Sequence, residues 1–142
     1  MNAALGRFMA VDYGEKRVGL AISDELGMIA SPAGFIARRA GKRAPIAEIV
    51  RRAESLEARG FVVGLPLDGE GNETEWTAEV RRVGAELEKR TSLPVRYVDE
   101  RYTTSASLRA IREMEGSTRG RKGDVDSMAA SILLQHALNV ER

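Results

Sequence analysis

The chain has 142 residues, of which 43% are hydrophobic and 30% are charged, and 22 basic against 21 acidic residues give a net charge of +1. This size is typical of one domain, so we expect residues 1–142 to form a single domain with its own core. The absence of cysteine excludes disulfides and thiolate metal sites, and a single histidine, His136, excludes a histidine-rich metal site. Any metal must therefore be bound by carboxylates and water, which favours Mg²⁺ or Mn²⁺.

No stretch approaches the ~20 apolar residues that a membrane-spanning helix needs. Residues Met1 to Gly6 lack the basic start and apolar stretch of a secretory signal, so we expect a cytoplasmic protein with no membrane partner. The net charge says nothing about nucleic acid, but residues 38–52 carry a local charge of +5, with six basic side chains and one acidic. Such a patch can bind phosphates, although charge runs are more often solvated surface.

Extended chain dominates the first third of the sequence. Residues 7–13 form a short apolar run that ends near an acidic residue, and residues 17–24 place Val18, Leu20 and Ile22 on one face. Residues 28–36 are consistent with a third strand. The connections between these segments are short enough for antiparallel hairpins.

Helical periodicity begins near Pro45, which suits a first helical turn, and Gly60 fits just past the end of this helix. Its apolar stripe would consist of Ile46, Ile49, Val50, Ala53 and Leu56. Residues 61–66 predict a buried strand, because the run is too short for a helix and is interrupted by Gly64 and Pro66.

A flexible loop at 68–72 leads into a second helix, for which Asn72 and Glu75 form a weak capping box. Its apolar side chains at helical spacing are Trp76, Val80, Val83 and Leu87. Residues 95–99 predict a fifth strand. A further helix from about Thr104 carries Leu108 and Ile111. The last helix, from about Val125, is expected to direct Met128, Ala129, Ile132 and Leu133 toward the core.

The expected order is three strands, then helix, strand, helix, strand, helix and helix. An antiparallel meander followed by βαβ crossovers implies a five-stranded mixed sheet with helices on both faces. This α/β order is that of the ribonuclease H-like fold.

Acidic residues occur at strand ends, where open α/β sheets collect their functional groups. Asp12 ends the first strand, Asp99 and Glu100 end the fifth, and Asp126 opens the last helix. If the first and fifth strands lie side by side and parallel, these carboxylates are neighbours. Carboxylates so gathered repel one another unless a cation lies among them, and two Mg²⁺ ions about 4 Å apart are a known arrangement for phosphodiester hydrolysis.

Each of these acids also has a purely structural interpretation. Asp12 could belong to a plain hairpin, and Glu100 could form a surface salt bridge with Arg101. Asp124 is better read as a helix cap than as a ligand. The combination of the three carboxylates is therefore stronger evidence than any one of them.

Four segments, VDYGEKRVGLAISD, VVGLPLDGEGNE, VDERYTT and KGDVDSMAASILLQ, resemble in this order the four motifs of the YqgF (RuvX) family. They extend over nearly the whole chain. The resemblance implies a ribonuclease H-like fold related to the RuvC resolvases. It also implies a nuclease that processes the 5′ end of precursor 16S ribosomal RNA, with a pre-ribosomal particle as partner; Holliday junction resolution on branched DNA was an earlier proposal for the family.

The resemblance further implies that Asp12, Glu100 and Asp126 are the catalytic carboxylates and the ligands of Mg²⁺ or Mn²⁺. RuvC resolvases carry a fourth acidic residue three positions before the last one. In this chain that position is Gly123, with Asp124 as the nearest acid, so a site with four carboxylates is in doubt.

Several basic residues are candidates for contact with nucleic acid. Lys16 and Arg17 follow the first strand, and Arg101 could brace the site or contact the scissile phosphate. Arg119, Arg121 and Lys122 lie in a glycine-bearing loop that could clamp the phosphate backbone or could simply be solvated. Trp76 is interpreted as a packing residue, and nothing in the sequence places His136 at the site.

Two other functions remain open. The hairpin around Asp12 also resembles the start of the phosphate-binding lobe of actin-like and sugar-kinase NTPases, but 142 residues leave no room for their second lobe. A non-catalytic RNA-binding module is the other alternative. Within the nuclease interpretation, aromatic residues are only 5% of the chain, which favours recognition of structured RNA, or of branched DNA, through backbone and shape. Monomer and dimer are not distinguished.

Overall fold

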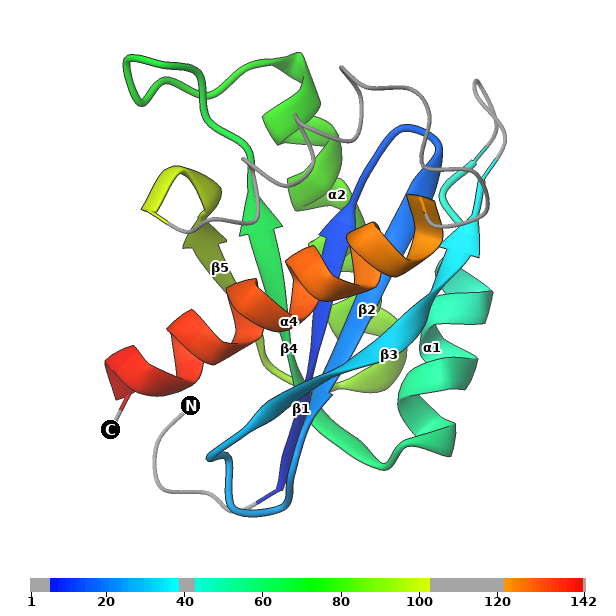
Figure 1. Cartoon of the computed structure of the whole chain (residues 1–142). Coiled ribbons are helices and arrows are strands. Elements are labelled where there is room, and N and C mark those ends of the chain that lie inside the picture. The colour runs from blue at the N-terminus through cyan, green and yellow to red at the C-terminus, as the bar shows by residue number, and fades with distance from the viewer. Residues whose placement is uncertain (1–5, 39–42, 103–121, 142) are drawn as a thin grey trace.

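A five-stranded sheet lies at the centre of the computed structural model, which describes residues 6–38, 43–102 and 122–141 (Figure 1). Its strands are β1 (Arg7–Tyr13), β2 (Arg17–Ser23), β3 (Ala30–Ala37), β4 (Ala58–Leu65) and β5 (Val95–Asp99). The helices are α1 (Ile46–Ser55), α2 (Glu75–Thr91) and α4 (Lys122–Glu141), with a short 3-10 helix, η1, at Glu100–Tyr102. The expected helix from Thr104 lies outside the described residues, as do Arg119 and Arg121.

The strand order is β3-β2-β1-β4-β5, and the sheet is mixed as predicted. β2 is antiparallel to both β1 and β3, whereas β1, β4 and β5 run parallel. The condition that the first and fifth strands lie side by side and parallel is met only in part, because β1 and β5 run parallel but β4 lies between them. The carboxyl ends of β1, β4 and β5 nevertheless meet at one edge of the sheet, which we call the carboxyl edge.

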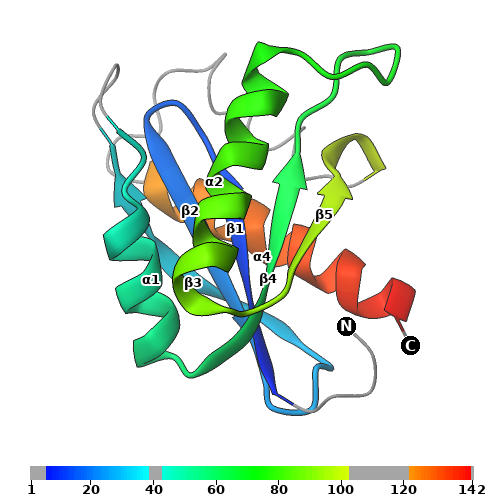
Figure 2. The ribbon, with the colours of Figure 1, turned by 180° about the vertical axis from the view of Figure 1, so that it is seen from behind.

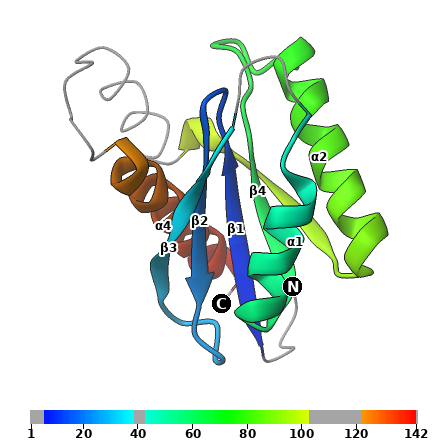
Figure 3. The same ribbon diagram turned by 90° about the vertical axis from the view of Figure 1, so that its right-hand side faces the viewer.

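Helices cover both faces of the sheet, as predicted. Figure 2 shows α1 and α2 on one face, and Figure 3 shows the sheet edge-on between these two helices and α4. The side chains of β1 alternate accordingly: Met9 and Val11 join the cluster under α1 and α2, while Phe8 and Ala10 pack with α4. Burial of the large apolar side chains in these two clusters contributes roughly 1.5–3 kcal/mol each.

Helix α1 has the predicted stripe, with Ile46, Ile49 and Ala53 buried. Its end differs from the expectation, because the helix stops at Ser55 and the left-handed position is Glu57, with φ 56°. Gly60 instead lies within β4. A β-carbon at Gly60 would lie 2.8 Å from the ring of Phe8, so this glycine serves strand packing rather than helix termination.

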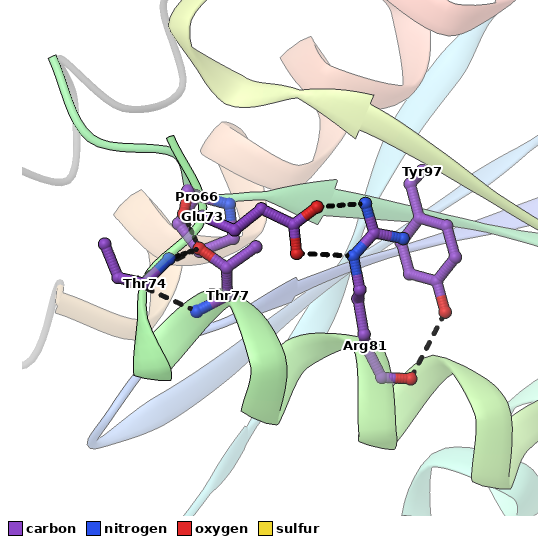
Figure 4. Close-up of polar contacts among 6 residues, drawn as sticks. All are labelled: Pro66, Glu73, Thr74, Thr77, Arg81 and Tyr97. Carbon is purple, nitrogen blue, oxygen red and sulfur yellow. Dashed lines mark hydrogen bonds and ion pairs between the residues drawn. The ribbon is translucent and has the colours of Figure 1, made fainter. Parts of the chain in front are cut away.

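Helix α2 begins two residues later than the predicted capping box. Thr74 is the N-cap, and Thr74 and Thr77 form the box reciprocally, so the Asn72–Glu75 prediction is wrong (Figure 4). The Thr77 hydroxyl also donates to the carbonyl of Pro66 at 2.5 Å. The buried side chain of Thr77 therefore links the first turn of α2 to the residue that follows β4. Trp76 packs against the core and stacks on Tyr13 at 5.4 Å between ring centroids, as its packing interpretation required.

Helix α4 begins at Lys122, three residues earlier than predicted. Asp126 therefore lies in its second turn, and Asp124 lies within the helix rather than at its N-cap. The buried face includes Ala129, Ala130, Leu133, Leu134, Ala137 and Leu138. Met128 is 50% exposed, so its assignment to the core is wrong. No helix in the described part of the chain combines the length and apolarity needed to cross a membrane.

Candidate active site

Asp12 lies one residue before the end of β1 and is 2% exposed. Alternation along the strand places its side chain on the face that carries Phe8 and Ala10, which is the face covered by α4. A carboxylate at this depth is costly unless it is paired, hydrogen-bonded or bound to a cation. Its burial therefore favours a functional role over that of a plain hairpin residue.

Glu100 follows β5 directly, and its side chain lies over β4 at Gly64. A β-carbon on Gly64 would lie 2.7 Å from Oε1 of Glu100 and 3.0 Å from Cδ2 of Leu133 in α4. The side chain of Glu100 is therefore on the α4 face, as Asp12 is. Because β4 separates β1 from β5, the missing side chain at Gly64 is what leaves room for Glu100 to extend toward β1.

Glu100 is buried, with 4% of the residue exposed. Burial, with a smaller contribution from the negative charge of Asp99, raises the pKa of Glu100 to about 7.

Asp126 reaches the site through a second glycine. Gly19 pairs with Asp12 across β1 and β2, and a β-carbon on Gly19 would collide with the backbone carbonyl of Asp126. Because Gly19 has no side chain, the backbone of α4 packs directly against β2. Gly19 is therefore next to both acids, because Asp12 pairs with it across the strands and the backbone of Asp126 packs on it from α4. Asp126 is 4% exposed.

Ser127 fastens α4 to the sheet beside Asp126. The pairing of β2 with β3 shifts register between Gly19 and Ala21. At this irregularity the buried Ser127 hydroxyl donates to the carbonyl of Leu20 at 2.9 Å and accepts from the amide of Gly34 at 3.0 Å. One side chain therefore satisfies a backbone group on each strand and fixes the position of the helix.

Arg17 is closer to the carboxylates than a surface phosphate contact would be. Its Nε donates to Oδ2 of Asp126 at 2.7 Å, and the two side chains are 17% and 6% exposed. Lys16, the neighbouring candidate, is exposed at the turn between β1 and β2. The two residues predicted together thus differ, since Arg17 is engaged with an acid of the site and Lys16 faces solvent.

Arg101 is tied to the end of β5. It donates to Asp99 through both Nε and Nη2, the latter at 2.9 Å, and this ion pair lowers the pKa of Asp99. Its guanidinium also packs against the β4–α2 connection, 3.1 Å from the position of a β-carbon on Gly71. These contacts favour the bracing interpretation of Arg101. Glu100 is buried, so a surface salt bridge does not describe it.

Three predicted carboxylates thus lie on the same face at the carboxyl edge. Among the described residues, however, no group of three acidic or histidine side chains is arranged closely enough to hold one metal ion. Asp126 accepts a hydrogen bond from Arg17, and a metal ion bound by Asp126 would have to displace this contact. The donor chemistry itself, three buried carboxylates without sulfur or imidazole, fits Mg²⁺ or Mn²⁺.

Other predicted residues do not join the site. His136 lies ten residues beyond Asp126 on α4, which is about 15 Å along a helix axis. The backbone of Lys122 is at the start of α4, but its side chain, like those of Arg119 and Arg121, is outside the described part of the structure. Gly64 and Ser127 were not singled out for the site from the sequence, although both lie within the four motif segments.

Comparison with known proteins shows the family of the chain. The model of the RuvX family, described as Holliday junction resolvase, matches residues 6–140. A protein of Clavibacter michiganensis subsp. michiganensis named "Putative pre-16S rRNA nuclease" is 39% identical over 97% of this chain and 86% of its own length. A protein of the same name from Koribacter versatilis is 40% identical over 94% of this chain and 87% of its own length.

Among solved structures, Thermus thermophilus RuvC in complex with a Holliday junction substrate superposes with a TM-score of 0.58 at 13% identity, covering 95% of this chain and 94% of that one. A second structure of T. thermophilus RuvC gives a TM-score of 0.56 at 12% identity, covering 94% and 95%. At this identity the likeness shows the fold, which is the ribonuclease H-like fold predicted from the element order.

Proposed function

Because the chain belongs to the RuvX family, we propose that it is a divalent-metal-dependent nuclease that processes the 5′ end of precursor 16S ribosomal RNA. The observation that supports this proposal is the burial of three carboxylates, Asp12, Glu100 and Asp126, which come from three separate motifs. Asp12, Glu100 and Asp126 would hold Mg²⁺ or Mn²⁺. When bound, such ions lower the pKa of an attacking water and stabilise the leaving oxygen of a phosphodiester.

The chain's own residues prepare the site for this chemistry. Gly64 leaves space for the side chain of Glu100, and Gly19 leaves space for the backbone of Asp126. A larger residue at either position would block that space. Ser127 fixes α4, and Arg17 orients the Asp126 carboxylate. Without metal the pKa of Glu100 is about 7, so this carboxyl must lose a proton to act as a ligand, and metal binding should weaken as the pH falls below 7.

Precursor RNA is favoured as the substrate by the names of the relatives, which share 34–40% identity with this chain over nearly its full length. Resolution of branched DNA is the competing function, supported by the description of the family model. Symmetric resolution would require two equivalent sites and therefore a dimer. Nothing in the described fold requires a second copy to complete the three carboxylates.

A cleavage assay distinguishes these functions. Purified protein with Mg²⁺ or Mn²⁺ is incubated with a 5′ segment of precursor 16S RNA and, separately, with a four-way DNA junction. Asp126→Asn is the test variant and the exposed Glu54→Gln on α1 is its matched control. Metal-dependent cleavage of the RNA that is lost only in Asp126→Asn supports the proposal.

Paired cuts in the junction without RNA cleavage would instead identify a resolvase. A protein that binds RNA but cleaves neither substrate would be a binding module. In that case Asp12→Ala would leave its function intact, and the catalytic assignment would be wrong.

A further inference from the structure

Arg17 and Asp126 form an ion pair within the proposed metal site. Nε of Arg17 donates to Oδ2 of Asp126 at 2.7 Å, and the two side chains are 17% and 6% exposed. A metal ion bound by Asp126 would compete with the guanidinium for the negative charge of this carboxylate. Arg17 therefore supplies a positive charge to Asp126 when no metal ion does.

The backbone is fixed on both sides of this ion pair. The amide of Gly14 donates to the carbonyl of Arg17 at 3.0 Å, and Arg17 pairs with Ala37 of β3. Ser127 bonds to β2 and β3, so the first turns of α4, in orange in Figure 1, are held across these strands. An aspartate side chain is short, whereas arginine has a long flexible stem. The ion pair therefore opens most readily through movement of the Arg17 side chain.

The guanidinium of Arg17 has donors left over for a phosphate group. A guanidinium donates from Nε and from both Nη atoms. Within the described part of the chain Arg17 donates from Nε, and no residue there accepts from its Nη atoms. Arg17 is two residues before Gly19, so its side chain is on the same α4 face of β2 as the packed backbone of Asp126. A guanidinium in this position is suited to bind a phosphate oxygen beside the carboxylates.

We propose that Arg17 alternates between Asp126 and a phosphate group of the substrate, and that this exchange couples metal binding to substrate binding. Without metal, the guanidinium neutralises Asp126. Binding of a metal ion to Asp126 releases Arg17, which then binds a phosphate of the polynucleotide. The inference rests on the proposed function, since it assigns a contact to that substrate. Because coupling is reciprocal, the metal raises the affinity for RNA by the same factor by which RNA raises the affinity for the metal.

Calorimetric titration with Mn²⁺, without RNA, tests the competition for Asp126. Arg17→Gln removes the competing charge and is expected to tighten Mn²⁺ binding about tenfold, as the loss of one charge-assisted hydrogen bond implies. Lys16→Gln is the control, because it removes the same charge from an exposed neighbour that forms no ion pair with a described residue. It should change the Mn²⁺ affinity less than about twofold.

Arg17→Lys keeps the charge and should bind Mn²⁺ nearly as weakly as the natural protein. Circular dichroism establishes that each variant is folded. Mn²⁺ binding that is unchanged or weaker in a folded Arg17→Gln protein would show that Arg17 is a permanent brace of Asp126, and would overturn the inference.

A second measurement uses the natural protein and so does not depend on the folding of a variant. The Nε–H proton of Arg17 is protected from exchange with water by its bond to Asp126. Its NMR signal should show exchange about tenfold faster after addition of Mg²⁺, because the bond is then open. Exchange that stays equally slow at saturating Mg²⁺ would contradict the release of Arg17.

Binding of a labelled RNA hairpin with a single-stranded 5′ extension tests the contact with phosphate. Ca²⁺ serves as the metal, since the same oxygen ligands bind it, and electrophoresis checks that the RNA stays intact. With Ca²⁺, Arg17→Gln should weaken binding about tenfold and reduce the slope of log K against log salt by about 1. With a chelator the loss should be only about twofold, because Asp126 already holds Arg17. Lys89→Gln, an exposed lysine on α2, is the control and should change neither value.

The two conditions separate the inference from the proposed function. An equal loss of RNA affinity with Ca²⁺ and with chelator would mean that Arg17 contacts RNA independently of the metal, and would overturn the coupling while leaving the nuclease intact. No loss in either condition would overturn the contact with phosphate. Failure of the natural protein to bind RNA at all would overturn the proposed function, whereas the Mn²⁺ titration would still decide whether Arg17 competes with the metal.

Discussion

The side chain of Glu100 occupies the space that a β-carbon on Gly64 would fill, with Oε1 2.7 Å from that position. This contact joins the end of β5 to the face of β4 and directs Glu100 toward the strand that carries Asp12. Gly19 has the same relationship to Asp126. Two strand glycines therefore determine how closely Glu100 and Asp126 approach the sheet beside Asp12.

Replacement of Gly64 by alanine should damage activity more than stability. The added methyl group meets Glu100 and Leu133, both flexible side chains that can move at a cost of about 1–2 kcal/mol. Because Glu100 must move, cleavage of precursor RNA should fall about 100-fold. Chemical denaturation and single-turnover cleavage measure the two effects. Full activity in a folded Gly64→Ala protein would contradict the assigned position of Glu100.

Replacement of Gly19 by alanine should chiefly destabilise the fold. Here the added methyl group meets the backbone of Asp126, which cannot move without shifting α4. We expect a loss of about 3 kcal/mol or more in the free energy of unfolding. Gly69→Ala is the control, because its methyl group meets open space and should change that free energy by less than about 1 kcal/mol. Equal stability of the two variants would show that α4 does not approach β2 as described.

Stability without metal should depend on pH through Glu100. Its pKa is about 7 in the folded protein against an ordinary value of 4.5 for a glutamate in water, so folding favours the protonated form. The stabilisation from this proton is complete below pH 4.5 and is lost as the pH rises through 7, a change of about 3 kcal/mol. Glu100→Gln has no proton to lose and should gain stability relative to the natural protein between pH 4.5 and 8. Unfolding in the presence of a chelator measures the difference, and a pH-independent difference would contradict the burial of Glu100.

Loss of the Ser127 hydroxyl should loosen α4. Ser127→Ala leaves the amide of Gly34 and the carbonyl of Leu20 without this partner, which should cost about 1–3 kcal/mol. Cleavage should also fall, about tenfold, because Asp126 precedes this anchor directly. Ser131→Ala in the same helix is the control, since its hydroxyl bonds only within α4, to the carbonyl of Met128. Similar results for both serines would mean that the bridge to the sheet does not position Asp126.

The strands were predictable because their side chains alternate and short polar turns separate them. The predicted bounds 7–13 and 95–99 coincide with β1 and β5. Helix ends were less predictable, because Thr74 and Asn72 are both suitable caps and only the tertiary bond from Thr77 to Pro66 selects between them. The start of α4 was placed too late. Met128 was assigned to the wrong face because the buried stripe continues through Ala130 and Leu134.

The candidate carboxylates were predictable from strand ends and from the resemblance, but their means of convergence was not. The sequence suggested neighbouring first and fifth strands, whereas β4 intervenes and Gly64 leaves room for Glu100. A glycine in a strand signals close approach without identifying what approaches. The pairing of Arg17 with Asp126 joins residues 109 positions apart, which no local pattern reveals.

Titration of the Glu100 carboxyl by NMR, with and without Mg²⁺, tests the central claim most directly. If Asp12, Glu100 and Asp126 hold one metal site, Mg²⁺ should lower the pKa of Glu100 from about 7, and Asp12→Asn should weaken that response. A pKa of Glu100 that is unchanged by Mg²⁺ at saturating concentration would contradict the shared site.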